Sequence, residues 1–231
     1  MSDYELYGDY NEVDEPPKKN GMGLAIKITA LVACFAVVGF IAFRLIAFNH
    51  YPSNIKNIYY TDNLTAYYNA TDGNIGALTQ ELRAPYDDEK LGNFFASNLI
   101  VIKEIGEIQI SVRYNTALYN KLGLEFSFDD MTFSLQRSGG DENATGALAG
   151  IPLDAKISVC ATDKYLMYRY AKIVIEGVDF GEGENAVEWL RLDMRINGLD
   201  SDEPFMLCIY ENNEAHSSFS EYKLSGKEKL K

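Results

Sequence analysis

The stretch Asn98–Asn115, NLIVIKEIGEIQISVRYN, carries the clearest secondary-structure pattern in the sequence and predicts a β-hairpin. Its first arm, Leu99–Ile102, is apolar throughout, which predicts a strand that is buried on both faces. In the second arm apolar and polar residues alternate, which predicts a strand with one face in the core and one face in water. The residues assigned to the wet face are Glu107, Gln109, Ser111 and Arg113. The tripeptide Glu104-Ile105-Gly106 supplies the turn between the arms.

The same alternation recurs in the rest of the chain. In LEFSFDDMTFSLQR, Leu124–Arg137, the apolar residues change from even to odd positions, which predicts a bulge or turn at Asp129-Asp130. Further strands are predicted in KISVCAT (156–162), YLMYRYAKIVIEGV (165–178), EWLRLDMRI (188–196), FMLCIY (205–210) and SSFSEYKL (217–224). About eight short strands separated by turn residues are typical of an all-β domain. We therefore predict an antiparallel β-sandwich, immunoglobulin-like or jelly-roll-like, over residues 91–225.

Residues 23–48, GLAIKITALVACFAVVGFIAFRLIAF, predict a transmembrane helix. The stretch is long enough to cross a hydrocarbon core of about 30 Å as an α-helix. Lys27 and Arg44 lie near its two ends, where their charges can reach water while their stems stay in the apolar layer. A cleaved signal peptide fits less well, because the apolar run is long for such a peptide and no small-x-small cleavage site follows it. The lipid bilayer is therefore a predicted partner, through residues 23–48.

The lysines and arginines near the span predict its orientation. Lys18, Lys19 and Lys27 lie at or before its start, whereas Arg44 and Lys56 lie at or after its end. This excess favours a cytoplasmic N-terminus and an extracytoplasmic C-terminal domain in the plasma membrane. The predicted plan is a disordered acidic cytoplasmic tail at 1–22, a transmembrane helix at 23–48, a connector at 49–90, the β-sandwich at 91–225 and a frayed tail at 226–231.

The connector shows no regular period. We interpret IYYTDNLTAYYNATDGNIGALTQELRAPYDDEK, residues 58–90, as a stalk or lead-in to the sandwich. Asp62 is predicted to cap a short helix that runs through Tyr68, and Asp72-Gly73 marks a turn. The sandwich is expected to fold without this segment, a metal ion or a disulfide, because 91–225 is long enough to enclose its own core.

The charge and composition of the chain argue against several classes of function. The net charge is −13, which argues against nucleic acid as a partner because phosphate binding needs a basic face. We predict no catalytic, cofactor or metal site: the two histidines, His50 and His216, lack zinc-ligand spacing, and no glycine-rich phosphate loop follows a strand. Asp200, Asp202 and Glu203 share one turn and offer oxygen ligands for calcium, but the full loop pattern is missing, so a solvated acidic turn is preferred. The protein is expected not to be an enzyme.

One strand carries a candidate contact patch. On the predicted wet face of EWLRLDMRI, the only tryptophan, Trp189, lies beside Arg191 and Arg195, with Leu192 on the core side. An aromatic ring with guanidinium groups suits a glycan or a protein partner. Asp193 lies on the same predicted face, and Arg113 and Arg169 are expected on neighbouring strands. The alternative is a solvated face with cross-strand ion pairs.

The sequence does not decide whether two of the cysteines form a disulfide. Cys160 and Cys208 both fall in predicted strands. Outside the cytoplasm they could form one disulfide, or they could remain two buried thiols that behave as small apolar side chains.

Several stretches resemble a group of uncharacterised membrane-anchored proteins of gut clostridia. The resemblance is carried by IYYTDNLTAYYNA, TQELRAPYDDEKLGNFFASNLIVIKEIGEIQISVRYN, YLMYRYAKIVIEGVDF and EWLRLDMRI. It implies a Gram-positive source and a single-pass anchor, and it transfers no activity or site residues. We expect a non-enzymatic binding or structural module of the cell envelope. The alternative is a transmembrane signalling or regulatory protein that acts through its acidic tail, and an envelope hydrolase with a carboxylate pair is least favoured.

Overall fold

The structure is a computed structural model that describes residues 21–80, 94–116, 128, 131–138, 150–183, 186–196, 205–211 and 219–224. It divides into two compact units, Met1–His50 and Tyr51–Lys231. Some predictions lie outside the described residues: the tail before residue 21, the bulge at Asp129-Asp130, the acidic turn at Asp200, Asp202 and Glu203, His216, and the end at 226–231.

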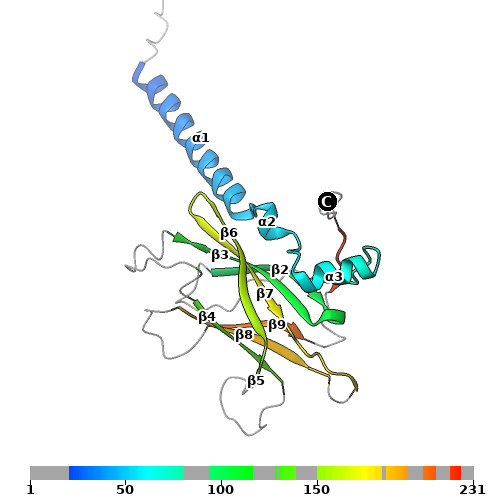
Figure 1. The fold of residues 1–231 in the computed structure, drawn as a ribbon. Helices are drawn as coiled ribbons and strands as arrows, with labels where there is room; N and C mark the ends of the chain where they lie inside the picture. Colours follow the sequence, from blue (N-terminus) through cyan, green and yellow to red (C-terminus); the bar gives the residue numbers. More distant parts are fainter. Residues whose placement is uncertain are drawn as a thin grey trace, which may run out of the picture. The chain divides into compact units, whose positions relative to one another are not determined.

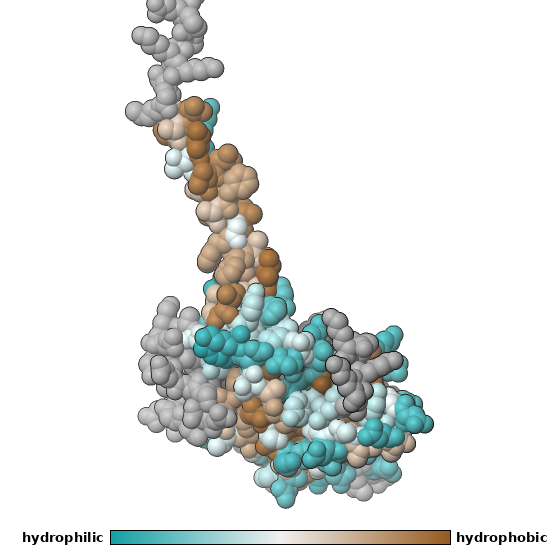
Figure 2. All heavy atoms as spheres, turned by 45° about the horizontal axis from the view of Figure 1, so that its top comes forward, coloured by the Kyte–Doolittle hydropathy of each residue, from teal (hydrophilic) through white to brown (hydrophobic). Residues whose placement is uncertain are grey.

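The first unit is built on one apolar helix, α1 (Gly21–Asn49). Within it, Gly23–Asn49 is long and apolar enough to cross a membrane by length and composition. Figure 2 shows hydrophobic residues along most of the visible face of this helix. The helix could therefore act as a membrane anchor, as the sequence predicts.

Two antiparallel sheets make up most of the second unit. The larger has six strands in the order β10-β1-β2-β3-β7-β6, and the smaller has four in the order β5-β4-β8-β9. The strands are β1 (Leu78–Gln80), β2 (Phe94–Ile102), β3 (Glu107–Asn115), β4 (Met131–Arg137), β5 (Ile151–Leu153), β6 (Lys156–Tyr165), β7 (Tyr168–Glu176), β8 (Trp189–Ile196), β9 (Phe205–Glu211) and β10 (Ser220–Glu221). The sheets lie face to face (Figure 1), which confirms the predicted antiparallel β-sandwich.

The predicted hairpin forms β2 and β3. Its turn is a short 3₁₀ helix, η1 (Lys103–Ile105), followed by Gly106 at φ +62°. A side chain at Gly106 is excluded, because an added Cβ would lie 2.5 Å from the carbonyl oxygen of Val178. All four residues of Leu99–Ile102 are fully buried, so the prediction of an arm with two buried faces is confirmed.

The two strands predicted at 156–162 and 165–178 form a second hairpin, but its turn lies further along the chain than predicted. The β-branched and aromatic residues of Tyr165–Val178 predict one strand, but Tyr165 ends β6 and pairs with Tyr168 at the start of β7. The two residues between them form the turn, and Leu166 adopts φ +53°. A leucine at this φ gives no turn signal, because such positions usually carry glycine, asparagine or aspartate.

The main core fills the space between the two sheets. Eight apolar residues of β3, β4 and β8, each set on one parity of its strand, point into it, as period two requires. They are Ile108, Ile110, Val112, Met131, Leu135, Leu190, Leu192 and Met194. Phe128, from before the predicted change of parity, is buried in the same cluster. Period two therefore identifies the core side of these strands correctly.

The described part of the stretch predicted as a connector contains α2 (Ser53–Lys56), α3 (Asp62–Ala70) and β1. The two helices form a third layer, whereas β1 joins the six-stranded sheet. Figure 1 shows both helices over the six-stranded sheet, on the side away from the four-stranded sheet. A separate apolar cluster, which includes Ile58, Leu64, Ile100 and Ile102, lies between this layer and β2.

The predicted helix and turn within that stretch are confirmed, but the predicted cap is wrong. The N-cap of α3 is Thr61, whose side-chain oxygen accepts a hydrogen bond from the Leu64 amide at 3.0 Å. Asp62 is the first helical residue, where its charge still suits the helix N-terminus. Asp72 and Gly73 have positive φ angles, as the predicted turn requires.

Candidate functional site

The polar face of β3 is buried, so the prediction that it faces water is wrong. The exposed fractions are 1% for Glu107, 0% for Gln109, 0% for Ser111 and 3% for Arg113. Residues Tyr51–Thr61, which include α2, hydrogen-bond to or pack against all four of these side chains. We call Tyr51–Thr61 the strap. The outer face of β3 is thus a second, polar interior of the domain, beside the apolar cluster on β2.

Two side chains of β3 bind the main chain of the strap. The amide group of Gln109 pairs with both backbone groups of Tyr59: Oε1 accepts from the amide nitrogen at 2.7 Å, and Nε2 donates to the carbonyl oxygen at 2.6 Å. Ser111 Oγ donates to the carbonyl oxygen of Ile55, whose side chain is fully buried. These bonds satisfy the part-buried backbone groups of Tyr59 and the buried carbonyl group of Ile55.

Thr61 joins the strap to α3 and to β3 at once. Its Oγ1 donates to Glu107 Oε2 at 2.7 Å while it accepts from the Leu64 amide as the cap of α3. The other carboxylate oxygen of Glu107 accepts from Gln109 Nε2, also at 2.7 Å. A hydroxyl can fill both roles because it is a donor and an acceptor. The start of α3 and the end of the strap therefore depend on one side chain.

Aromatic rings surround Arg113 near the start of the strap. Its guanidinium carbon lies 5.0 Å from the ring centroid of Tyr51, 5.0 Å from that of Phe95 and 5.1 Å from that of Tyr168. Tyr51 also meets Tyr170 edge to face, with ring centroids 5.2 Å apart. Such cation–π contacts are strongest when water is excluded, and Arg113 is almost fully buried.

The contacts follow a regular order along both segments. Moving backwards along β3, every second residue meets a residue further along the strap: Arg113 with Tyr51, Ser111 with Ile55, Gln109 with Tyr59 and Glu107 with Thr61. The strap therefore runs antiparallel to β3, in one register that four side chains specify. A shift of the strap along the strand would break all four contacts together.

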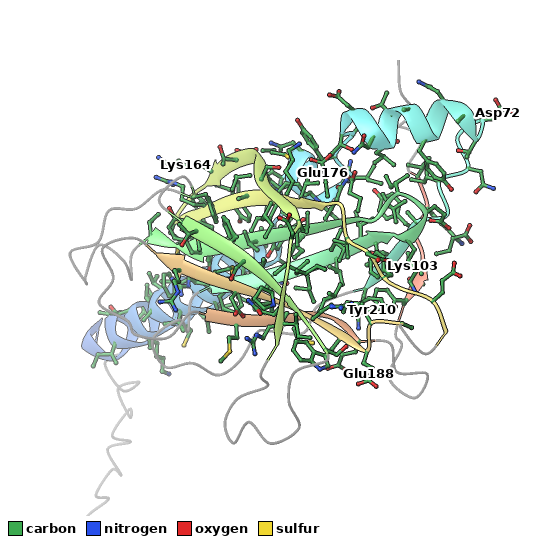
Figure 3. The ribbon with its side chains drawn as sticks, turned by 60° about the horizontal axis from the view of Figure 1, so that its bottom comes forward. Asp72, Lys103, Lys164, Glu176, Glu188 and Tyr210 are labelled. Atoms are coloured by element: carbon green, nitrogen blue, oxygen red, sulfur yellow. The ribbon has the colours of Figure 1, made fainter. Side chains whose placement is uncertain are left out.

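Two further charged groups lie on this face. Lys172 of β7 pairs across the sheet with Ser111 and is fully buried, and α2 packs against both β6 and β7. Glu176, also of β7, forms an ion pair with Lys156 of β6 at 2.6 Å; Figure 3 shows Glu176 near the helices of the third layer. Burial raises the pKa of Glu107, and the nearby Glu176 raises it further, although the hydrogen bonds from Gln109 and Thr61 oppose this. A charged Glu107 is therefore costly to keep beneath the strap.

The predicted contact patch on β8 is only partly in water. Arg191 Nε and Nη2 donate to the Asp193 carboxylate at 2.7 and 3.1 Å, and the guanidinium carbon lies 5.9 Å from the Trp189 ring centroid. The Arg191 and Asp193 side chains are only 12% and 8% exposed, so the wet-face prediction is wrong for this pair. Arg195 is exposed, as predicted, and Trp189 is half-buried.

The other arginines named with the patch lie elsewhere. Arg113 of β3 and Arg169 of β7 belong to the six-stranded sheet, whereas β8 belongs to the four-stranded sheet. The prediction that they are neighbours of Arg191 is therefore wrong. The predicted patch of Trp189, Arg191 and Arg195 therefore lies on β8 alone, in the four-stranded sheet.

The cysteines are free thiols on different sheets. Cys160 lies on β6, in the larger sheet, and Cys208 lies on β9, in the smaller one. Burial raises the pKa of both thiols, that of Cys208 to about 11. Both side chains are therefore protonated at neutral pH and are weak nucleophiles. Within the described ranges, no three His, Cys, Asp or Glu side chains gather where they could hold a metal ion.

Comparisons with known proteins found no relative, so the proposed function is argued from the geometry of the described residues. No protein-family model matches the chain, and neither does a curated protein or a solved structure.

The residues at the buried polar face that the sequence did not predict are Tyr51, Ile55, Tyr59 and Thr61 of the strap. Tyr51 and Ile55 are four residues apart, as on a helix face, but the intervening Pro52 and the short length of the segment hide that signal.

Proposed function

We propose that the protein is a single-pass, membrane-anchored β-sandwich on the extracytoplasmic side of a Gram-positive plasma membrane. It acts there as a non-enzymatic binding or structural module of the cell envelope. The observation that carries this proposal is the absence of a spacer: α1 ends at Asn49, the second unit begins at Tyr51, and the strap is bound to β3 from its first residue. One intervening residue spans at most about 3.6 Å. A domain tethered in this way is suited to work at the membrane surface.

The lysines near the span support the orientation. Lys18, Lys19 and Lys27 at its N-terminal side favour a cytoplasmic tail. Protease added to intact protoplasts is expected to degrade residues 49–231 and to leave a short membrane-bound fragment, detected with an N-terminal tag. A domain that is degraded only after the protoplasts are lysed would contradict the orientation.

The outer face of the four-stranded sheet is the proposed contact surface for a glycan or a protein. Thr132 and Ser134 of β4 and Arg195 of β8 are exposed on it, and Thr132 pairs directly with Arg195. The half-buried Trp189 adds an aromatic surface on the same strand. The exposed Arg195 offers the donor geometry that carboxylates and sugar hydroxyls require.

Sedimentation of residues 51–231 with purified cell-wall material tests this surface. The wild-type fragment is expected to sediment with the wall, and Arg195→Glu is expected to weaken binding at least about ten-fold through loss and reversal of one charge. Lys164→Glu is the matched control, because Lys164 is an exposed cation on β6 of the other sheet. Equal losses in both variants would indicate a nonspecific charge effect, and no binding by any variant would refute the glycan form of the proposal.

A second candidate function is transmembrane signalling, and the strap favours it. The chain continues from α1 through His50 into a segment held in register on β3, so the strap links the anchor to the sheet along the chain. An acidic tail that binds a cytoplasmic partner would supply the other end of such a relay. Pull-downs with residues 1–22 and with residues 51–231 separate the two candidates, since only the relay requires a partner for the tail.

A further inference from the structure

We propose that the strap is a reversible latch that couples the position of the membrane anchor to the outer face of the six-stranded sheet. In the latched state Tyr51–Thr61 lies on β3 as described above. In the released state the strap leaves β3 and uncovers Glu107, Arg113 and Lys172, while the two-sheet core stays folded. This inference rests on the proposed membrane anchoring and adds to it a conformational change within the domain.

The distribution of apolar contacts separates the strap from the main core. The cluster between the two sheets contains no residue of Tyr51–Thr61, whereas Ile58 belongs to the smaller cluster around α3 and β2. Loss of the strap therefore removes no side chain from the space between the sheets. Segments with few contacts to the main core open at a lower free-energy cost than the whole domain.

Buried charged residues on the covered face favour release of the strap. Three charged residues, Glu107, Arg113 and Lys172, are at most 3% exposed beneath or beside the strap. Burial of charges is costly, and their return to water on release offsets part of the contacts that are lost. A permanent cover is better served by apolar residues, as the opposite face of β3 illustrates with Ile108, Ile110 and Val112. The buried polar row thus lowers the free energy of release.

The bonding pattern gives the latch two discrete states. Four contacts share one register, and two of them bind the strap through its main chain at Ile55 and Tyr59. The strap cannot slide along β3 without breaking all four contacts. Tension on the strap therefore detaches it from β3 in one step and does not deform it gradually. A two-state element that a distant segment can bias is the physical requirement for coupling between sites.

Thiol labelling of the full chain in lipid nanodiscs tests the latch. In a background of Cys34→Ala, Cys160→Ala and Cys208→Ala, Ile55→Cys reports the strap and Ile173→Cys reports the main core, since both wild-type side chains are fully buried. The two variants are compared in thin dimyristoleoyl and thick dierucoyl phosphatidylcholine bilayers. Mismatch between a span and its bilayer costs fractions of a kcal/mol per Å and tilts or displaces the helix.

The latch predicts that Ile55→Cys reacts at least about ten-fold faster than Ile173→Cys, and that its rate differs about three-fold or more between the two bilayers. Insertion of about twelve glycine and serine residues after His50 is expected to abolish the bilayer dependence, because a flexible linker removes the tension. Equal rates for the two cysteines in every bilayer would overturn separate opening. A bilayer dependence that survives the linker would overturn coupling through the chain.

Two controls keep the outcomes distinct. Recovery of the chain with the nanodiscs on size exclusion shows membrane anchoring by itself, so failure of the proposed anchoring is seen before any labelling. Hydrogen exchange of the unsubstituted chain tests the latch without any cysteine variant. The Ile58 amide donates to the Tyr222 hydroxyl, and the Tyr59 amide donates to Gln109. Both amides are expected to exchange faster than the amide of Ile173. Exchange of all three only by global unfolding would refute the latch.

Discussion

The outer faces of the two sheets look alike in the sequence and differ in the structure. On β3 the polar residues are Glu107, Gln109, Ser111 and Arg113, and on β8 the corresponding set is Trp189, Arg191, Asp193 and Arg195. The set on β3 lies under the strap and is at most 3% exposed, whereas Arg195 on β8 is exposed and Trp189 is half-buried. Period two tells which side of a strand avoids the main core, but it does not tell whether another layer covers that side.

The buried charged side chains of β8 and of β3 also differ in the groups that compensate their charges. On β8 Arg191 and Asp193 are two residues apart on one strand and form their own ion pair. On β3 Arg113 is held by three aromatic rings, and Glu107 by two hydrogen bonds, one of them from the strap. The β8 pair depends on its own strand, so it should tolerate changes elsewhere. The β3 set depends on a segment about fifty residues away in the sequence.

The largest expected effect is the loss of the third layer together with β1. A fragment of residues 51–231 is expected to melt in one cooperative transition. A fragment of residues 91–231 lacks the strap, α3 and β1, so Ile100 and Ile102 and the charges on β3 lose their cover. We expect its melting temperature to fall by more than about 10 °C, as measured by circular dichroism. Equal melting of the two fragments would restore the interpretation of residues 49–90 as a dispensable connector.

The next largest effect concerns the inner face of β8. Leu192 is fully buried in the core between the sheets, so Leu192→Ala is expected to cost about 2–5 kcal/mol in chemical denaturation. Arg191→Ala leaves the nearly buried Asp193 carboxylate without its ion pair and is expected to cost about 1–3 kcal/mol. A smaller loss for Leu192→Ala than for Arg191→Ala would mean that the two faces of β8 are assigned the wrong way round.

Two arginines compare the outer faces directly. Arg113→Ala removes contacts with three rings at a buried site and is expected to cost about 2–4 kcal/mol. Arg195→Ala, at an exposed site on the other sheet, is expected to change the free energy of unfolding by less than about 0.5 kcal/mol. Urea titration of both variants of the 51–231 fragment measures the difference. Similar values for the two would indicate that the strap does not bury Arg113 in solution.

The smallest expected effect is a pH dependence of stability that originates at Glu107. Because its pKa is raised in the folded protein, the folded state holds this proton more tightly than the unfolded chain. Its contribution to stability is therefore fully present below the ordinary pKa of a glutamate and is lost as the pH rises through the raised value.

The variant Glu107→Gln removes this proton equilibrium. Its free energy of unfolding relative to wild type is expected to increase with pH across that window and then to level off. Glu188→Gln is the control, since Glu188 is exposed (Figure 3 labels its position). A difference between Glu107→Gln and wild type that does not change with pH would contradict the proposed burial of the charge.

Local features of the fold were readable from the sequence for identifiable reasons. Glycine at position 106 marks the β2–β3 turn because the φ there is positive and Val178 leaves no room for a side chain. The alternation over β8 identifies Leu192 as a core residue because successive side chains point to opposite faces. In the β6–β7 turn the local signal fails, because Leu166 occupies a backbone conformation that leucine rarely adopts.

The sequence by itself determined the apolar N-terminal helix, the all-β class of the domain and the core side of β3, β4 and β8, because these depend on composition and on periods of a few residues. Only the tertiary structure decided what happens on the other side of those strands. Whether Arg113 meets water or Tyr51 depends on the packing of a distant segment, and the period of β3 is the same in both cases. The hydrogen bonds of Gln109 and Ser111 go to strap main-chain atoms, which every residue type possesses, so side-chain identity in the strap carries little trace of the contact.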